Sequence, residues 1–287
     1  MIREMFRKGD IERDAGLTSP EDIERFDDIQ YGTDCPKWQM LDVYRPKELQ
    51  GKLPVIVSVH GGAWVYGDKD VYQYYCMSLA QRGFAVVNFS YRLAPEYKYP
   101  ASFEDVNAVC EWITANADRY GLDTDNIFAV GDSAGAHMLS LYCCACANAE
   151  YAAETGYAVQ KDLRFKAIAL NCGAFLIETH DGDMTTAIMD EYLPEGGTEK
   201  ELKMISPLYH LNEKFPPAFI MTCPGDFLNN QPIKVIPALE KLEIPFVYRR
   251  YGSAEDKLGH VFHCNMRLDA AKLCNDEEAA FFRTFMK

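Results

Sequence analysis

Short strand-like runs alternate with longer helix-like stretches along most of this chain of 287 residues. The strand-like runs are short and rich in Val, Ile and Phe, and they cover residues 41–44, 54–59, 84–89, 127–130, 166–170, 218–222 and 246–251. The helix-like stretches cover residues 71–82, 103–116, 134–149, 233–242 and 267–287. Alternation of this kind predicts an α/β fold class, with a mostly parallel central sheet and helices on both of its faces.

Two segments do not fit the alternation. Residues 1–28 are charged and are expected to be helical. Residues 174–210 are punctuated by Gly182, Pro194 and a Gly196-Gly197 pair, which predicts a loop-helix insertion. Because long insertions after a strand usually carry function, we expect both segments to form a small cap over one face. Residues 1–287 are therefore predicted to be one domain with cap elements at 1–28 and 174–210.

Composition removes several classes of function. The 29 Lys and Arg against 43 Asp and Glu give a net charge of −14, which repels nucleic acid and anionic lipid surfaces. No run of about 18 apolar residues is present, so no membrane-spanning helix is expected. The charged start MIREMFRKGDIERD does not suit a signal peptide. The ten cysteines are then expected to be reduced thiols in a cytoplasmic protein.

The cysteines also contain one CxxC spacing, formed by Cys143 and Cys146. No second Cys or His pair lies near it in the sequence to complete a tetrahedral metal site. We therefore expect these cysteines to be small buried residues, and we expect no metal and no cofactor.

The strongest chemical signal lies where the strand at 127–130 runs into Gly131-Asp132-Ser133-Ala134-Gly135 and then into a helix. Glycines on both sides of the serine allow a tight strand-to-helix turn that exposes the serine hydroxyl. The N–H groups at the start of a helix favour the negative charge of a tetrahedral intermediate. Ser133 is therefore the candidate nucleophile.

A serine nucleophile needs a base and a carboxylate that orients the base. In a fold of this kind they follow the serine in the order acid, then histidine, on loops after late strands. Asp226 and His260 have this order and placement, and they are the predicted partners of Ser133. Asp256 and His263 are the rival candidates.

A second loop, His60-Gly61-Gly62-Ala63-Trp64, follows the strand at 54–59. Backbone amides in such a glycine loop are open to a close approach, so Gly61 and Gly62 are predicted to form an oxyanion hole together with Ala134. His60 is expected to anchor the loop by hydrogen bonds rather than to take part in proton transfer.

Together these motifs resemble the hormone-sensitive-lipase-like branch of the α/β-hydrolases. The resemblance covers residue 38 to the end of the chain and rests on five segments in the expected order: His60-Gly61-Gly62, the stretch 91–105 with YRLAPE and YPA, 131–135, 226–228 and 260–262. It implies an α/β-hydrolase fold and a serine esterase that acts on short acyl esters without a cofactor. The cap that it implies coincides with the two segments that break the alternation.

Three positions depart from the family pattern: Ala63, Ala136 and Asn230 stand where a glycine, a glycine and an acid are usual. The loop at 60–64 and the start of the helix at 135–138 are also similar to acetyl esterases and to xylan or feruloyl esterases. This similarity implies deacetylation of sugars or related small esters. Trp64 and Asp132 are expected to contact the substrate, with Trp64 as a wall of the acyl or alcohol pocket.

Some alternatives stay open at this point. An arylformamidase-like amidase would use the same residues, a hydrolase-fold binding protein would not catalyse, and a lipase would act at a membrane. The expected partner is a small-molecule ester. The natural substrate, and whether the chain forms a homo-oligomer, are not determined by the sequence.

Overall fold

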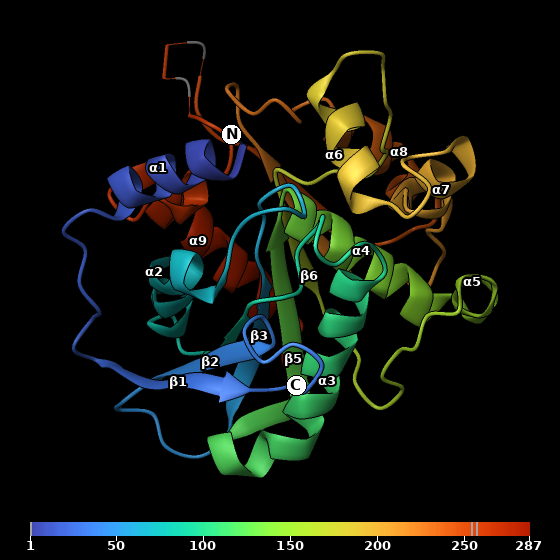
Figure 1. Ribbon diagram of the computed structural model, residues 1–287. Coiled ribbons are helices and arrows are strands. Elements are labelled where there is room, and N and C mark those ends of the chain that lie inside the picture. The colour runs from blue at the N-terminus through green and yellow to red at the C-terminus, as the bar shows by residue number, and fades with distance from the viewer. Residues whose placement is uncertain (1, 254, 257) are drawn as a thin grey trace.

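The computed structural model describes residues 2–253, 255–256 and 258–287, which form a central sheet between two layers of helices (Figure 1). The sheet has eight strands in the order β1-β2-β4-β3-β5-β6-β7-β8. The strands are β1 (Ile23–Gln30), β2 (Met40–Pro46), β3 (Leu53–Val59), β4 (Ala85–Phe89), β5 (Leu122–Asp132), β6 (Ile168–Asn171), β7 (Ala218–Thr222) and β8 (Phe246–Arg250).

The pairing is parallel from β4 through β3, β5, β6 and β7 to β8. At one edge, β1 pairs antiparallel with β2, and β2 pairs antiparallel with β4. The predicted mostly parallel sheet is thus confirmed. Because the carboxyl ends of parallel strands meet at one edge of a sheet, the loops after β3, β5, β7 and β8 are brought together.

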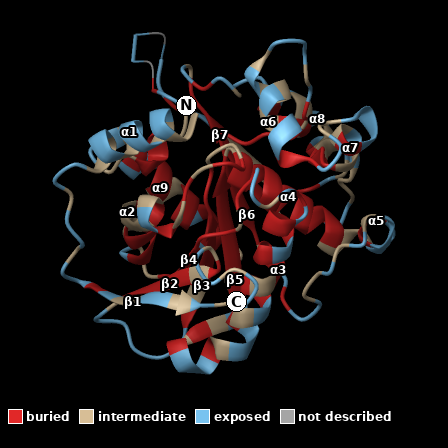
Figure 2. Cartoon of the chain, in the orientation of Figure 1, coloured by how far each residue is buried: buried red, intermediate tan, exposed pale blue. Residues whose placement is uncertain are grey.

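The nine helices of the described residues are α1 (Ile2–Asp14), α2 (Lys69–Ala80), α3 (Ala101–Tyr120), α4 (Ala134–Ala147), α5 (Ala149–Thr155), α6 (Met184–Tyr192), α7 (Glu199–Met204), α8 (Gln231–Lys241) and α9 (Asp269–Arg283). One face of the sheet packs against α3, α4 and α8, and the other packs against α2 and α9. Figure 2 shows the result, with buried strands inside helices whose outer surfaces are exposed. Helices on both faces agree with the prediction.

The amino-terminal segment differs from the expectation of a helical stretch over residues 1–28. Helix α1 ends at Asp14, and Ile23–Gln30 form strand β1. This strand pairs only with β2, so its outer edge faces solvent and accepts charged side chains such as Glu24 and Asp27. The charge that suggested a surface helix is therefore also suited to an edge strand.

The structure bears on two expectations from composition, the state of the cysteines and the membrane-spanning character of the helices. All ten cysteines are free, and Cys143 is buried in α4 with Cys146 partly buried one turn later. Within the described residues, no helix combines the length and the apolar character needed to cross a bilayer.

Candidate active site

The predicted nucleophile occupies a strained turn between β5 and α4. Ser133 has φ 51° and ψ −117°, a backbone conformation that a residue with a side chain rarely adopts. Its N–H donates to the carbonyl of Asn171 at 3.0 Å, which ties the turn to the end of β6. A Cβ on Gly135 would come within 2.0 Å of the carbonyl oxygen of Val59, so only glycine fits there. The close packing of this turn against β3 thus explains why the sequence pattern has a glycine at position 135.

Asp226 and His260 form a hydrogen-bonded pair on the loops after β7 and β8. The Nδ1 of His260 lies 2.6 Å from the Oδ1 of Asp226. The carboxylate also accepts from the hydroxyl of Thr222 at 2.7 Å and from the N–H of Leu228 at 2.8 Å. Burial alone would raise the pKa of Asp226, but these hydrogen bonds, led by that from His260, hold it below its ordinary value. The carboxylate is therefore kept ionised and faces the imidazole.

The two rival residues lie elsewhere. Asp256 is exposed on the loop after β8. His263 is fully buried, and burial lowers its pKa to about 3, which keeps the imidazole neutral. The structure thus pairs the two residues favoured by the sequence order, and leaves Asp256 and His263 outside that pair.

Ser133 and His260 line one cavity of about 310 Å³, which we call the site cavity. Its other lining residues come from α1, from the loop after β3, from α2, from the end of β5 and from the loops after β7 and β8: Met5, Phe6, Gly9, Asp10, Arg13, Gly61, Gly62, Ala63, Tyr66, Tyr72, Asp132, Phe227 and Val261. Ser133 and His260 thus meet at one opening, and Asp226 is hydrogen-bonded to His260.

The loop after β3 requires a correction to the predicted oxyanion hole. The N–H of Gly61 donates to the hydroxyl of Tyr72 at 3.0 Å, so it is already engaged and does not face a substrate. Among the described residues, no acceptor is found for the N–H groups of Gly62 and Ala63, which both belong to the cavity wall. The free amides of this loop therefore lie one residue further along than predicted.

The loop reaches this geometry through positive φ angles. Gly62, Ala63 and Trp64 have φ of 116°, 52° and 60°. A Cβ on Gly62 would come within 2.1 Å of the carbonyl oxygen of Tyr66, which explains the glycine. Ala134 starts α4, so its N–H has no acceptor within the helix. Gly62, Ala63 and Ala134 thus present three backbone donors.

Tyr72 connects the loop to the residue that precedes the nucleophile. Its hydroxyl accepts from Gly61 and donates to the Oδ2 of Asp132 at 2.7 Å. Asp132 is 2% exposed, and burial raises the pKa of its carboxyl to about 6. Asp132 lines the site cavity, and the Oδ2 of its carboxylate is bound by Tyr72. Its expected contact with the substrate stays a prediction.

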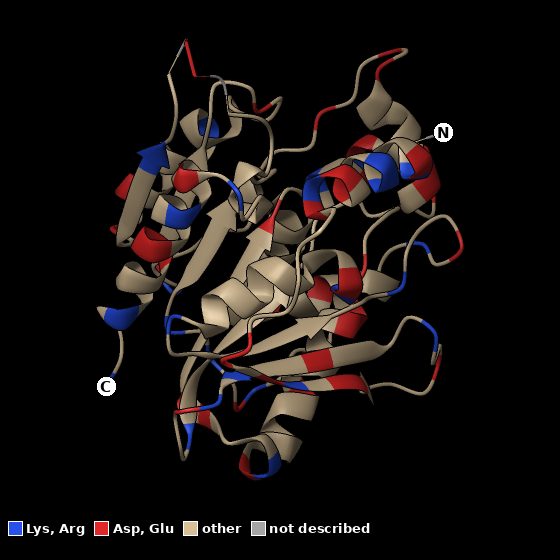
Figure 3. Ribbon diagram, turned by 90° about the vertical axis from the view of Figure 1, so that its left-hand side faces the viewer, with Lys and Arg blue, Asp and Glu red and all other residues tan. Residues whose placement is uncertain are grey.

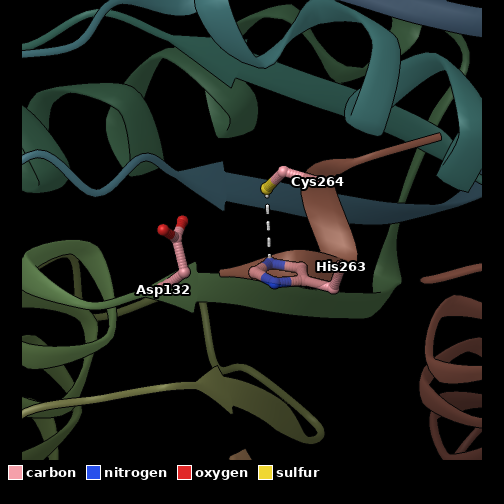
Figure 4. A group of neighbouring side chains, drawn as sticks. All are labelled: Asp132, His263 and Cys264. Atoms are coloured by element: carbon pink, nitrogen blue, oxygen red, sulfur yellow. Dashed lines mark hydrogen bonds between the residues drawn. The ribbon is translucent and has the colours of Figure 1, made fainter. Parts of the chain in front are cut away.

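Asp132 also lies near His263 and Cys264, and Figure 4 shows the thiol of Cys264 hydrogen-bonded to the imidazole of His263. One ligand atom from each residue lies within 4.8 Å of those of the other two. A carboxylate, an imidazole and a thiol suit zinc, but a closed structural zinc site needs four protein ligands. The burial of all three residues favours their neutral forms, since it also raises the pKa of the Cys264 thiol. Among the three residues only the thiol of Cys264 and the imidazole of His263 are hydrogen-bonded, and three buried groups that favour their neutral forms do not suit a metal ion.

Trp64 and the histidines of the site region are buried around the loop after β3. The indole N–H of Trp64 donates to the Nδ1 of His137 at 3.2 Å, and its ring stacks on Tyr192 at 5.1 Å. Trp64 is buried and is not among the residues that line the site cavity, and its expected contact with the substrate stays a prediction. The Nε2 of His137 donates to the carbonyl of Ile205 at 2.6 Å. His60 stacks on Tyr91 at 3.9 Å, and its Nδ1 lies 2.7 Å from the carbonyl oxygen of Gly61, which agrees with the expected anchoring of the loop by hydrogen bonds.

Helix α1 covers the site cavity, and its side chains Met5 and Phe6 line the cavity wall. The outer surface of α1 carries many of the charges seen beside the N label in Figure 3. Two arginines fasten the helix. Arg3 donates to the carbonyls of Val65 and Ala94 and pairs with Glu96 at 2.5 Å. Near the other end, Arg13 pairs with Asp10 and Asp14 and donates to the carbonyl of Val71. The first helix is therefore held over the site cavity.

Three buried polar side chains, Tyr75, Asn171 and Glu278, form a hydrogen-bonded group next to the turn that carries Ser133. Glu278 of α9 accepts from the side chain of Asn171 at 2.7 Å and from the hydroxyl of Tyr75 at 3.0 Å. Burial raises the pKa of Glu278 to about 7. Because the carbonyl of Asn171 accepts a hydrogen bond from the N–H of Ser133, this group of side chains is connected to the strained turn.

The sequence reasoning missed Tyr72, Asn171, Glu278 and the arginines of α1. Each acts through a contact with a distant part of the chain, such as the 60 residues that separate Tyr72 from Asp132. The charged start of the chain carried a signal for a cap but not for its anchoring residues. No local motif marks Tyr72 or Glu278.

Comparison with known proteins agrees with this geometry. The BD-FAE family model matches residues 41–230. The carboxylesterase NlhH of Mycobacterium tuberculosis is 30% identical over 213 residues, which cover 69% of this chain and 63% of NlhH. The versiconal hemiacetal acetate esterase of Dothistroma septosporum is 39% identical over 94 residues, which cover 32% of this chain and 29% of that enzyme. The chain thus matches less than two thirds of the length of these relatives.

A solved structure extends the likeness to the whole fold. Esterase B from Lactobacillus rhamnosis superposes with a TM-score of 0.88 at 24% sequence identity, covering 98% of this chain and 92% of that one. The match includes the sheet and the helices on both of its faces. With the family model matching most of the chain and the motifs grouped at one cavity, this chain belongs to the BD-FAE family, within the hormone-sensitive-lipase-like α/β-hydrolases that its motifs resemble.

Proposed function

We propose that this protein is a serine carboxylesterase that hydrolyses short acyl esters. One observation carries the proposal: Ser133, in a strained turn at the start of α4, shares a cavity with His260, whose Nδ1 is bound to a buried carboxylate. An exposed serine, a neutral imidazole and an orienting acid are the parts that acyl transfer to water requires. The names of the sequence relatives, esterases in each case, support the same reaction.

The proposed reaction has two halves. His260 takes the proton of Ser133 through Nε2 while the hydroxyl oxygen attacks the ester carbonyl, and Asp226 stabilises the resulting imidazolium. The oxyanion is held by the N–H groups of Gly62, Ala63 and Ala134. His260 then gives its proton to the leaving alcohol, and water repeats the route on the acyl-enzyme.

Acetyl and propionyl esters are the proposed acyl range. The cavity volume of about 310 Å³ is at the lower end for small-molecule sites, which hold roughly 300 Å³ or more. Its roof carries Met5 and Phe6 on a helix that is fastened at both ends. A series of p-nitrophenyl esters from acetate to octanoate tests this range. A maximum of kcat/KM at octanoate would contradict it.

The catalytic proposal is tested by Ser133→Ala. Loss of the nucleophile lowers kcat by about a million-fold in a comparable triad, so we expect p-nitrophenyl acetate hydrolysis to vanish. A fluorophosphonate probe should label the wild type and not the variant. Ser140→Ala is the matched control, because that hydroxyl is buried in the same helix and bonds only to the carbonyl of Ala136. Near-full turnover by Ser133→Ala would end the proposal.

A further inference from the structure

Phe227 is a large apolar side chain that the fold leaves in solvent. It is 66% exposed, although it directly follows the buried Asp226. Its ring packs on the imidazole of His260 with 4.1 Å between ring centroids and a tilt of 37° between the ring planes. It also lines the site cavity, as does Met5, which is 57% exposed. Exposed aromatic surface beside a reactive cavity indicates a binding contact rather than core packing.

The chemistry of the proposed reaction fixes which part of a substrate lies there. His260 must give a proton to the oxygen of the leaving alcohol, so that oxygen lies beside the imidazole. The Nδ1 of His260 is bound to Asp226, which leaves Nε2 for this transfer. The group attached to the alcohol oxygen therefore passes Phe227, the side chain that lies on the imidazole. The oxyanion donors bind the carbonyl oxygen, which is bonded to a different atom from the alkyl group of the alcohol.

We propose that Phe227 is a platform for the alcohol part of the substrate, and that this part carries a flat ring face. This inference rests on the proposed function and adds the class of alcohol to it. Aromatic rings and the C–H faces of pyranose sugars both stack on a phenyl ring, and both have the required shape. A flexible alkyl alcohol gains less, because it must order its own bonds to cover the same surface.

A competing role for Phe227 is to hold His260 in place. That role would change kcat for every ester by the same factor, because the imidazole serves all of them. A platform instead changes the ratio of kcat/KM between ring-bearing and ringless alcohols. Substrates that share one acyl group separate the two roles.

The experiment uses three acetates: benzyl acetate, a methyl glucopyranoside acetylated on its primary hydroxyl, and n-butyl acetate. The variant Phe227→Leu keeps apolar volume and removes the flat ring. We expect it to lower the ratio of kcat/KM for at least one ring-bearing acetate over butyl acetate by about fivefold, the size of one aromatic contact. The control is Tyr209→Leu, because Tyr209 is also an exposed aromatic side chain but does not line the site cavity. Its ratio should not change.

The two ring-bearing acetates identify the source of the ring. A loss confined to benzyl acetate assigns an aromatic alcohol, and a loss confined to the glucopyranoside assigns a sugar. Equal loss on all three acetates, or no loss on any, overturns the platform. A wild type that neither hydrolyses these acetates nor reacts with a fluorophosphonate overturns the proposed function itself, which is a distinguishable result.

Discussion

Removing the hydroxyl of Tyr72 tests how the loop after β3 is positioned. In Tyr72→Phe, the N–H of Gly61 loses an acceptor at 3.0 Å and the carboxylate of Asp132 loses a donor at 2.7 Å. Both groups belong to the buried interior, and each unsatisfied group costs about 1–3 kcal/mol. We therefore expect the free energy of unfolding to fall by about 2 kcal/mol or more.

The same change should lower catalysis more than binding. Loss of one oxyanion donor costs about a hundredfold or more in kcat, and here the proposed donors Gly62 and Ala63 are loosened rather than removed. We expect kcat for p-nitrophenyl acetate to fall by about tenfold to a hundredfold, with KM changed by less than about threefold. Steady-state kinetics on protein shown to be folded by circular dichroism provides the measurement.

Tyr142→Phe is the matched control for this prediction. The hydroxyl of Tyr142 is also buried, donates to Asn107 at 3.1 Å and accepts from the N–H of Gln160 at 3.2 Å. It makes two hydrogen bonds like Tyr72, but it does not line the site cavity. If both variants lose similar stability and keep similar kcat, the hydrogen bonds of Tyr72 do not position the loop.

Three further predictions follow from other contacts. Asp226→Asn should lower kcat by about four orders of magnitude, because the amide no longer holds the imidazole in its reactive tautomer, whereas Asp256→Asn on the exposed loop should match the wild type in the same assay. Glu278 has an ordinary pKa of 4.5 that burial raises to about 7, so the folded state binds the extra proton and stability falls as the pH rises through this window, by about 3 kcal/mol. Urea denaturation at about pH 5 and 8 should show a smaller loss for Glu278→Gln than for the wild type or Glu277→Gln, and parallel behaviour of all three would refute the assignment. Arg3→Ala frees one end of α1 from Val65, Ala94 and Glu96, so the ratio of kcat/KM for octanoate over acetate should rise severalfold. The exposed Arg7→Ala on the same helix is its control, and an unchanged ratio in Arg3→Ala would show that α1 does not limit acyl length.

Most of the sheet could be predicted because its strands are short apolar runs that are separated by helical stretches. Strand β7 begins and ends where the sequence indicated, at Ala218 and Thr222. Strand β1 could not be predicted, because its apolar residues Ile23, Phe26 and Ile29 recur at every third position, which is not the period of a strand, and because its pairing with β2 is a tertiary contact. Local pattern thus failed at the edge of the sheet, where burial is least.

The candidate site also contains residues that the sequence could predict and a loop geometry that it could not. Ser133, Asp226 and His260 could be predicted because each lies in a short motif and their order along the chain is characteristic. The direction of the amides after β3 could not, since it depends on three successive positive φ angles and on a tyrosine from α2. Spacing alone therefore placed the loop correctly and its free N–H groups one residue too early.

The anchoring of α1 has a practical consequence for work with the purified protein. The helix that begins at Ile2 forms part of the wall around the reactive serine, whereas Lys287 lies at the far end of the sheet (Figure 1). An affinity tag fused ahead of Ile2 would sit beside the bonds of Arg3 that hold this helix in place. A tag fused after Lys287 avoids this conflict, so kinetic constants from the two kinds of fusion should not be pooled.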